Sequence, residues 1–494
     1  MKLLSLLILY SLLVGLKGHR DFVQIELAQL PIELDVRKVR TVNESRLINL
    51  LGVKLFDLDD RVSFSPSLAS KFYWKDSGKK LFIELKENVH FSDSSSVSVH
   101  DVISSLVRCI VSSDKTLKSL FKNLTNYEGL IKTKDHSKTI VQHNKSTIQI
   151  NLERKSPLIL EGLSHSSCSI LKNNTGINLL KGAVSSGPYI VSKVDSSSLV
   201  LIKNKFFKRR DQRPNKIIFE SKMSKNKSDL IIKTTKEKIS GYRRYPYHFL
   251  GSWYLSLNTQ SPNLKNIKLR KVLFELFDKR EFLSHLGWPL NLAQKKLIPF
   301  GMRGFLVDNL NLKNKKNKQL NKVLRDLGYS KTNKLSLNLL LLRRESFLID
   351  REIWSTSFPS ELIKLNVEEL EYSNYIKKKN KYDYDLVFHG KSPGSIEPHV
   401  LLGSYHSNSI YNTSNIIVKT CDDLISSSIK ESDLELRYKK YRDAENCVLS
   451  LFPVIPIASV KKKYLYIRKP WKLLRRNMFL LYPYKLEEWI KDEN

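Results

Sequence analysis

The chain has 494 residues, of which 41% are hydrophobic and 10% aromatic, and its formal net charge is +35 at pH 7. This length is more than one hydrophobic core usually supports, so we expect two or more domains, and the hydrophobic content excludes an intrinsically disordered chain. A basic surplus of this size attracts anionic partners such as nucleic acid, phospholipid headgroups and acidic polymers.

The basic residues are not gathered in one segment. They form clusters at 203–210, 313–318, 377–379, 461–463 and 475–476. Such a spread favours a solvated basic surface over a dedicated binding site for a polyanion. A role at polyanions or at an anionic membrane surface remains the alternative, and no specific nucleic-acid partner is expected.

The N-terminus has the pattern of an export signal. Met1 and Lys2 precede an apolar run over 3–16, and 17–19 are polar or small. A short basic start and an apolar run of about 14 residues are typical of a secretory signal peptide, whereas a spanning helix needs about 20 residues. We expect export and cleavage near residue 18, with an uncleaved anchor as the alternative. No cysteine follows the run, so a lipoprotein anchor is not expected.

Residues 55–108 predict a series of short elements. The segment 65–74 contains Pro66 and reads as the start of a helix, and a polar turn follows at 75–79. Residues 80–86 alternate between two faces, which predicts a strand. A polar stretch then leads into an amphipathic helix that opens at 99–102.

Later segments also give local predictions. Gly187 permits a tight turn and Pro188 stiffens the approach to a strand, and an alternating strand follows at 199–202. Over 267–286 the apolar residues recur at helical spacing, which predicts one helix with a buried face. These apolar positions are Leu269, Val272, Leu273, Leu276 and Phe277.

The order of these motifs resembles the family 5 extracellular solute-binding proteins, the periplasmic dipeptide-, oligopeptide- and nickel-binding components of ABC importers. Ser94 stands where that family has a glycine. The resemblance is densest in the block 55–108. The matching positions there are Pro66, Leu68, Ala69, Trp74, Gly78, Lys79, Phe82, Leu85, Val89, Phe91, Asp93, Asp101 and Val102.

The resemblance continues through most of residues 25–465. Residues 30–35 resemble the family's opening strand and turn, with Val36 in place of a proline. Other segments resemble a strand before a buried helix, a Gly-Pro turn, a strand that crosses between lobes, and two further helices, the second with a returning strand. The similar segments are 148–158, 186–191, 204–207, 253–258, 278–280, 287–299, 320–329 and 438–456.

The resemblance implies an α/β fold with two lobes joined by two crossover strands, as in the type II periplasmic binding proteins of the large peptide-binding class. It implies a signal peptide at 1–18 and a first lobe at 19–255, which residues 460–494 rejoin. The second lobe would span 256–459. The ligand would lie in the cleft, and closure about a hinge would bury it.

No catalytic motif accompanies this pattern. The sequence contains no G-x-S-x-G, H-E-x-x-H or phosphate-binding G-x-x-x-x-G-K-[ST] motif, so we expect no enzymatic activity. His389, His399 and His406 lie 10 and 7 residues apart. Structural or solvent-exposed histidines are favoured there over metal or haem ligands, and we expect no metal and no cofactor.

The four cysteines are Cys109, Cys168, Cys421 and Cys447. An exported protein can form disulfides, and four cysteines allow three connectivities. We favour the pairs Cys109–Cys168 and Cys421–Cys447, because each pair lies within one predicted lobe. Without a C-x-x-C motif, a redox or zinc role is not expected.

Two cleft positions depart from the family pattern. Its peptide-binding members anchor the ligand's ammonium group with an aspartate four residues before a proline, whereas Gly394 occupies that position before Pro398 and Lys391 lies nearby. Arg40 stands where oligopeptide binders have a glutamate. Either the alignment is locally shifted, and Glu397 provides the carboxylate, or this cleft prefers a neutral or anionic ligand or a peptide that is held in another way.

Apolar walls with a few placed polar groups are typical of a small-ligand cleft. Core packing is the alternative for each aromatic candidate. The complete set of candidate ligand-binding residues is Arg40, Val42, Trp253, Tyr254, Trp288, Phe388, His389, Lys391, Gly394, Glu397 and Tyr405.

We therefore expect a monomeric periplasmic solute-binding protein. It would capture a peptide or peptide-like solute by lobe closure and deliver it to an ABC permease in the inner membrane. The alternative is an exported basic protein on the same scaffold, with an altered or lost peptide site, that associates with polyanions or the membrane surface.

Overall fold

The computed structural model describes residues 21–27, 30–39, 41–58, 64–112, 115–156, 158–207, 212–221, 223, 227–233, 236–299, 301–305, 317–343, 350–391, 397–473, 486 and 489–492. Arg40, Gly394 and the expected signal peptide lie outside this part of the chain. Within it, none of the helices combines the length and the apolar composition that crossing a membrane requires.

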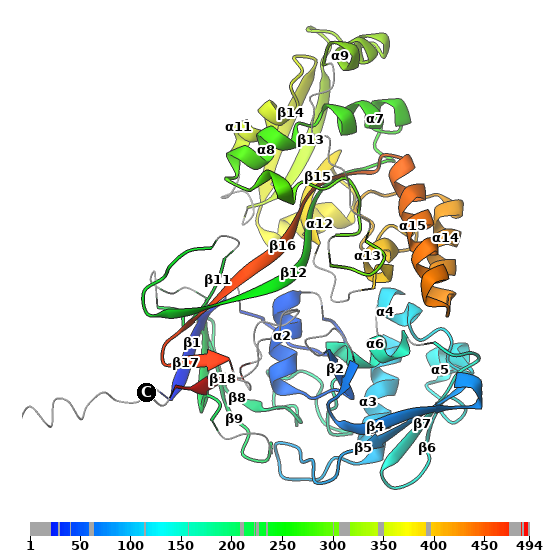
Figure 1. Cartoon of the computed structure of the whole chain (residues 1–494), viewed down its shortest axis with the longest axis vertical. Helices are drawn as coiled ribbons and strands as arrows, with labels where there is room; N and C mark the ends of the chain where they lie inside the picture. Colours follow the sequence, from blue (N-terminus) through cyan, green and yellow to red (C-terminus); the bar gives the residue numbers. More distant parts are fainter. Residues whose placement is uncertain are drawn as a thin grey trace, which may run out of the picture.

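The chain folds into two lobes, with lobe I at the bottom of Figure 1. Lobe I contains two four-stranded sheets. The first has the order β1 (Phe22–Glu26), β10 (Lys216–Glu220), β9 (Ser198–Lys203) and β8 (Tyr189–Val194). The second has the order β4 (Ala69–Lys75), β5 (Lys80–Leu85), β7 (Thr147–Asn151) and β6 (Ile140–Gln142). Two short pairs are β2 (Phe56–Leu58) with β3 (Phe64–Pro66), and β17 (Trp471–Leu473) with β18 (Trp489–Lys491).

The helices of lobe I complete its cores. Val102 and Leu106 on helix α3 are buried in one cluster with Leu81 and Ile83 of β5. The amphipathic helix and the alternating strand predicted here are therefore confirmed. The helical elements are α2 (Val42–Leu51), α3 (Val99–Ser112), α4 (Lys115–Ser119), α5 (Tyr127–Thr133), α6 (Ile159–Ser164), η1 (Asp76–Gly78) and η2 (Ser166–Cys168).

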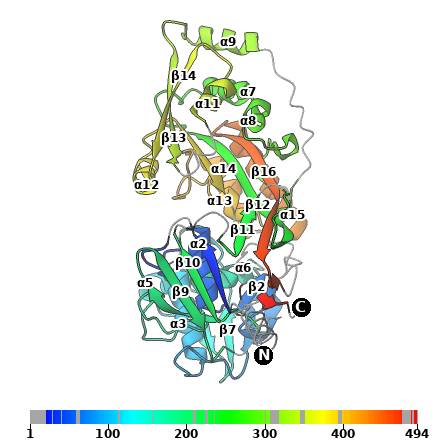
Figure 2. The same ribbon diagram turned by 90° about the vertical axis from the view of Figure 1, so that its left-hand side faces the viewer.

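A six-stranded mixed sheet extends through both lobes, and its larger part forms the centre of lobe II with helices on its faces (Figure 2). The strand order is β11 (Leu230–Lys233), β16 (Val454–Arg468), β12 (Tyr242–Leu257), β15 (Leu386–Lys391), β13 (Leu335–Leu342) and β14 (Ile363–Leu370). The helical elements are α7 (Ile267–Leu276), α8 (Lys279–His285), η3 (Leu290–Leu292), α9 (Asn317–Asp326), α11 (Arg351–Ser357), α12 (Tyr372–Asn380), α13 (His399–Gly403), α14 (Lys419–Lys430) and α15 (Leu434–Ser450).

Strands β12 and β16 belong to both lobes. They pair antiparallel from Tyr242 opposite Arg468 to Ser256 opposite Val454. Toward one end, side chains of these strands are buried in a core of lobe I, and toward the other end in a core of lobe II. Figure 1 shows the two strands passing together from one lobe into the other. The register shifts twice along the way, between His248 and Gly251 and between Trp253 and Tyr254.

The predicted helix start at 65–74 is wrong. Pro66 ends β3, and Ala69–Lys75 forms strand β4, which pairs antiparallel with β5. The aromatic side chains of Phe72, Tyr73 and Trp74 lie opposite Ile83, Phe82 and Leu81 on β5. Aromatic residues pack well in such cross-strand pairs, and the tight turn at η1 joins the two strands with Gly78 at φ +88°. Pairing with β5 therefore makes Ala69–Lys75 a strand rather than a helix.

The single helix predicted over 267–286 is interrupted. Helix α7 ends at Leu276, and Asp278 begins α8 by accepting hydrogen bonds from the backbone N–H groups of Arg280 and Glu281. An aspartate at such an N-cap satisfies N–H groups that would otherwise lack partners. The backbone N–H of Asp278 donates to the Ser357 carbonyl instead of continuing the first helix.

The strand expected at 30–35 is also wrong. The opening strand is β1, which ends at Glu26, and Asp35 contributes only an isolated bridge to Asn178. The Asp35 carboxylate binds the guanidinium of Arg37, with 2.7 Å from Oδ2 to Nη2. This local pair stabilises a turn at the place where a strand was expected.

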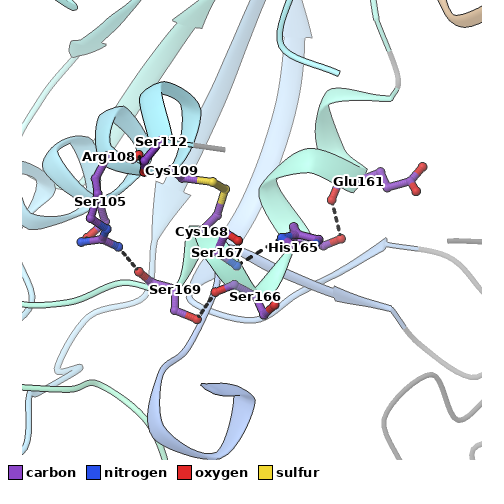
Figure 3. The surroundings of a disulfide bond; sticks show 11 residues. Ser105, Arg108, Cys109, Ser112, Glu161, His165, Ser166, Ser167, Cys168 and Ser169 are labelled. Atoms are coloured by element: carbon purple, nitrogen blue, oxygen red, sulfur yellow. Dashed lines mark hydrogen bonds between the residues drawn. A yellow bond between two sulfur atoms is a disulfide. The ribbon is translucent and has the colours of Figure 1, made fainter. Parts of the chain in front are cut away.

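Both disulfides favoured by the sequence are present in the structure. Cys109–Cys168 joins α3 to η2 in lobe I (Figure 3), and Cys421–Cys447 joins α14 to α15 in lobe II. They close sequence separations of 59 and 26 residues. Each bond therefore constrains one lobe and leaves the other free to move relative to it.

Candidate functional site between the lobes

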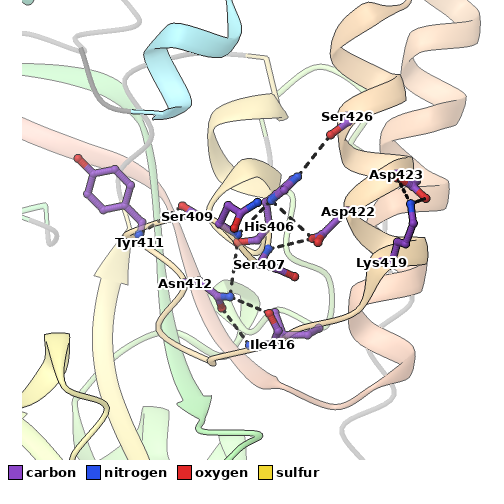
Figure 4. Close-up of polar contacts among 11 residues, drawn as sticks. His406, Ser407, Ser409, Tyr411, Asn412, Ile416, Lys419, Asp422, Asp423 and Ser426 are labelled. Atoms are coloured by element: carbon purple, nitrogen blue, oxygen red, sulfur yellow. Dashed lines mark hydrogen bonds and ion pairs between the residues drawn. The ribbon is translucent and has the colours of Figure 1, made fainter. Parts of the chain in front are cut away.

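The end of β15 brings several candidate residues to the side of lobe II that faces lobe I. Strands β12 and β15 are antiparallel, with Ser252 opposite Lys391 and Leu257 opposite Leu386. Because β12 enters lobe II from lobe I, the last residue of β15 lies at the end nearest lobe I. Figure 4 shows these two strands, pale green and pale yellow, running in opposite directions.

One face of this strand pair is aromatic. The rings of Trp253 and Phe388 stack at 5.1 Å with an interplanar angle of 11°, and the Trp288 ring lies 6.0 Å from Trp253. Phe388 is buried against Trp354. A Cβ atom on Gly390 would lie 3.2 Å from the Trp253 ring, so the glycine leaves room for this ring. Phe388 belongs to the core, whereas Trp253 and Trp288 keep partly exposed edges.

The opposite face is polar and largely buried. The Tyr254 hydroxyl donates to the Leu297 carbonyl at 2.7 Å. The His389 Nε2 atom lies 2.8 Å from the Ser256 hydroxyl and 3.1 Å from the Thr413 hydroxyl. Burial, together with the positive charge of Lys391, holds the pKa of His389 well below its ordinary value. His389 is therefore a neutral member of a hydroxyl network at neutral pH.

The loop after α13 supports this polar face (Figure 4). The Asn412 side chain donates to the Ile416 carbonyl at 2.9 Å and accepts from the Ile416 backbone N–H at 3.2 Å. These two bonds fix the tight turn that contains Thr413, the residue that reaches His389. His406 in the same loop lies 3.7 Å from the Asp422 carboxylate and has no contact with His389 among the described residues.

Lys391 extends from this polar face at the end of β15. Its Nζ atom lies 2.6 Å from the Ser404 hydroxyl and 4.1 Å from the centroid of the Tyr405 ring. The side chain is partly exposed, whereas Tyr405 is buried. Burial, with a smaller contribution from Lys379, lowers the pKa of Lys391 to about 7.

Glu397 is held by arginines. Its carboxylate lies 2.8 Å from Arg303 Nη1 and 3.6 Å from Arg437 Nε, and only 4% of the glutamate side chain is exposed. A buried carboxylate is tolerated when such partners compensate its charge. In this structure Glu397 fastens α15 to the start of α13.

The two lobes meet at a buried polar contact. His399 Nε2, at the start of α13, lies 3.7 Å from the Glu161 carboxylate on α6 of lobe I. The His399 side chain is 0% exposed. Burial and the neighbouring Arg437 lower the pKa of His399 to about 3. Figure 3 shows that α6, which carries Glu161, lies beside the Cys109–Cys168 disulfide.

The lobe I candidate Val42 lies at the start of α2. Thr41 caps this helix by accepting from the Glu44 backbone N–H at 3.1 Å, and the Glu44 carboxylate accepts from the Thr41 N–H at 3.0 Å. Val42 is 39% exposed at this end. Arg40, the position that departs from the family pattern, lies outside the described residues.

A cavity of about 370 Å³ lies within lobe I and not between the lobes. Its walls include Leu51, Asp93, Ile190 and Lys193, and none of the candidate binding residues lines it. Among the described residues, no cluster of three or more histidine, cysteine, aspartate or glutamate side chains could hold a metal ion.

The structure thus separates the candidate residues by surroundings. Trp253, Trp288 and Lys391 have partly exposed side chains, whereas Tyr254, Phe388, His389, Glu397 and Tyr405 are buried. Sequence reasoning missed the partners that position them. These are Glu161, Ser256, Arg303, Ser404, Thr413 and Arg437. No local pattern marks them, because the residues in each contact are at least 13 positions apart in the chain.

Residues 63–413 match the family described as bacterial extracellular solute-binding proteins, family 5 Middle. The chain belongs to this family. The periplasmic oligopeptide-binding protein OppA of Salmonella typhimurium is 22% identical over 485 residues, which cover 89% of this chain and 86% of that protein. This family consists of solute-binding proteins rather than enzymes.

Solved structures of similar proteins share the two-lobed α/β fold. The Haemophilus influenzae OppA complex with RPPGFSPFR has a TM-score of 0.80 at 17% identity, covering 96% of this chain and 99% of that one. The Escherichia coli murein tripeptide binding protein MppA has a TM-score of 0.79 at 16% identity, with the same coverage. An unliganded open form of MppA gives 0.63, at 16% identity and covering 96% of this chain and 98% of that one.

Proposed function

We propose that this protein captures a peptide or a peptide-like solute between its lobes and delivers it to an ABC permease in the inner membrane. Support comes from its family and from its similarity to proteins named for oligopeptide and murein tripeptide binding. Capture is noncovalent. It requires no chemical step, no metal and no cofactor from the protein, which acts as a monomer.

The observation that carries this proposal is the pair of strands that both lobes share. Strands β12 and β16 provide side chains to a core in each lobe, so each lobe holds them firmly. The register shifts between the two cores interrupt the regular pairing. Such points absorb changes in backbone angle during hinge closure. We place the hinge there, with lobe I at 19–255 and 460–494 and lobe II at 256–459.

The arrangement corresponds to a closed form in this proposal. The His399–Glu161 contact joins the lobes, and the TM-score is lower for the open MppA form than for the other MppA structure. A ligand favours closure only through contacts that it makes with both lobes at once. The start of α2 and the end of β15 are the surfaces that we assign to those contacts.

Within that space we assign ligand contact to the side chains that keep exposed surface. Trp253 and Trp288 would cover apolar parts of the solute, and Lys391 would meet a polar group. Val42, together with Arg40, would contribute from lobe I. The buried candidates would set the shape of the site from behind these residues.

The protein would work in the periplasm after export and removal of residues 1–18. The periplasmic relative supports this location. A permease would recognise the closed form, in which both lobes present one continuous surface. Some attraction to anionic membrane surfaces follows from the net charge of +35.

A thermal-unfolding panel on residues 19–494 tests this function. It would contain di- to pentapeptides, N-acetylated peptides, muropeptides, nickel chelates, haem, oligosaccharides and heparin. A ligand at 100 times its Kd stabilises the folded state by about 2.7 kcal/mol. We expect at least one peptide class to raise Tm and to reduce the radius of gyration in solution scattering. A response to heparin alone would replace this function with polyanion binding.

A further inference from the structure

Lys391 lies at the end of β15 that is nearest lobe I. It is the last residue of β15 and pairs with Ser252 on the crossing strand β12. Eight residues further along the chain, His399 contacts Glu161 of lobe I. The ammonium group lies against Ser404 at the end of α13, the helix whose first residue makes the contact between the lobes.

The charge of Lys391 is not matched by an acidic group in the described part of the protein. Its contacts there are the Ser404 hydroxyl at 2.6 Å and the Tyr405 ring at 4.1 Å, and no described carboxylate lies within ion-pair distance. The charge that contributes to its lowered pKa is the like charge of Lys379 on α12. The ammonium group is thus oriented by an oxygen and a ring but not neutralised.

A neighbouring charge is treated differently. Glu397 lies in the segment between β15 and α13 and is more buried than Lys391. Arg303 and Arg437 both lie against its carboxylate. The fold therefore supplies counter-charges at this end of the sheet where the structure requires them. An ammonium group that lacks one carries a desolvation penalty that an incoming anion would remove.

We propose that the solute held between the lobes presents an oxyanion, either a carboxylate or a phosphate, to the ammonium group of Lys391. This inference rests on the proposed function and specifies the ligand class. Ser404 orients the lysine from one side and Tyr405 from another, which leaves the remaining N–H of the ammonium group for the ligand. A solute that places its own ammonium group there meets a like charge in a poorly solvated position.

The pH dependence has a defined sign. Lys391 has its pKa lowered to about 7 without ligand, and a bound anion raises it. Binding an anion above pH 7 therefore takes up a proton, and affinity for anionic solutes should fall as pH rises above 7. Below pH 7 the lysine is already charged, so this group adds little further dependence.

The test uses ligand pairs that differ by one anionic group. They are tri-alanine and its C-terminal amide, N-succinyl- and N-acetyl-tri-alanine amide, and phosphoseryl- and seryl-dialanine amide. Isothermal titration calorimetry would compare the wild type with Lys391→Met and Lys391→Arg. Lys364→Met is the control, because it removes the same charge from exposed strand β14 of the same sheet.

We expect the wild type to favour the anionic member of at least one pair by about 10- to 100-fold, the range for a charge-assisted hydrogen bond. Lys391→Met should abolish this preference, while Lys391→Arg and Lys364→Met retain it. The second and third pairs distinguish a carboxylate from a phosphate. The preference should also decline between pH 7 and pH 9.

Two results would overturn the inference in distinguishable ways. The oxyanion site is wrong, while the peptide function stands, if peptides bind but the anionic member of each pair binds no more tightly than its partner. The same conclusion follows if Lys391→Met keeps the preference for the anionic member. If none of these solutes nor any other peptide binds the wild type, the proposed function fails and this inference fails with it. A lysine retained only to pack on Tyr405 would make no distinction within a ligand pair.

Discussion

Two charged groups near the end of β15 have opposite surroundings. Glu397 is almost fully buried and contacts two arginines, whereas Lys391 is partly exposed and contacts only neutral groups in the described structure. The first arrangement is complete without a ligand. The second leaves a charge that the protein alone does not balance, and such a charge is expected where a ligand completes the site.

The same contrast applies to the aromatic residues. Phe388 is enclosed by Trp253 and Trp354 and contributes to the core of lobe II. Trp253 stacks on Phe388 but is only partly buried. A residue with every side in contact stabilises the fold, whereas a residue with one open side is available for binding.

The largest effect should follow from removing the buried carboxylate. Glu397→Gln leaves the buried Arg437 without its charge partner, so we expect the free energy of unfolding to fall by about 3 kcal/mol. Urea denaturation of the mature protein would measure this change. Glu361→Gln is the matched control, because Glu361 pairs with Lys331 at an exposed site and should lose less than about 1 kcal/mol. Equal losses in both variants would contradict a structural role for Glu397.

Local patterns predicted much of the fold. The apolar alternation of 80–85 and the amphipathic period of 99–112 appear as β5 and α3, because each element buries the face that its own sequence marks. Strand β4 was mistaken for a helix because its conformation depends on pairing with β5. The break before α8 depended on one capping aspartate inside an otherwise continuous apolar pattern.

The candidate site was predictable only in part. Lys391 could be selected from the sequence because it lies in a segment that resembles the family's ligand loop. The arginines at Glu397 and the Glu161–His399 contact could not be selected, since they join distant segments, and the second exists only when the lobes meet. Burial also separates Trp253 and Trp288, which are partly exposed, from Tyr254, Phe388 and Tyr405, which are buried in the core. Composition alone does not make this distinction.

An intermediate effect should come from the contact between the lobes. His399 faces Glu161 from α6 and Arg437 from α15, and its pKa is about 3 in this arrangement. In an open form its pKa should return toward 6.5, so the open form binds the proton more readily. The closed form is therefore fully favoured above pH 6.5 and loses stability as pH falls toward 3.

Solution scattering would detect this response. Between pH 7.5 and pH 5 we expect the ratio of closed to open forms to fall by up to about 30-fold, with a larger radius of gyration. His399→Gln should weaken the response, because it removes the titrating group. Glu161→Gln is the control that removes the opposing charge but keeps the histidine. An unchanged pH response in His399→Gln would exclude this histidine as its source.

The smallest expected effect is that of Lys391→Met on the free energy of unfolding, and its sign should be opposite to that of Glu397→Gln. Lys391→Met removes an uncompensated ammonium group and keeps an apolar side chain against Tyr405, so the unliganded protein should gain about 1 kcal/mol or lose nothing. Because the folded pKa is about 7 and the ordinary value is 10.5, the penalty is complete below pH 7 and disappears as pH rises toward 10.5. The gain from the substitution should therefore shrink between pH 7 and pH 9.5 in urea denaturation. A loss of about 2 kcal/mol at pH 7 would show instead that Lys391, like Glu397, is a charge that the fold itself requires.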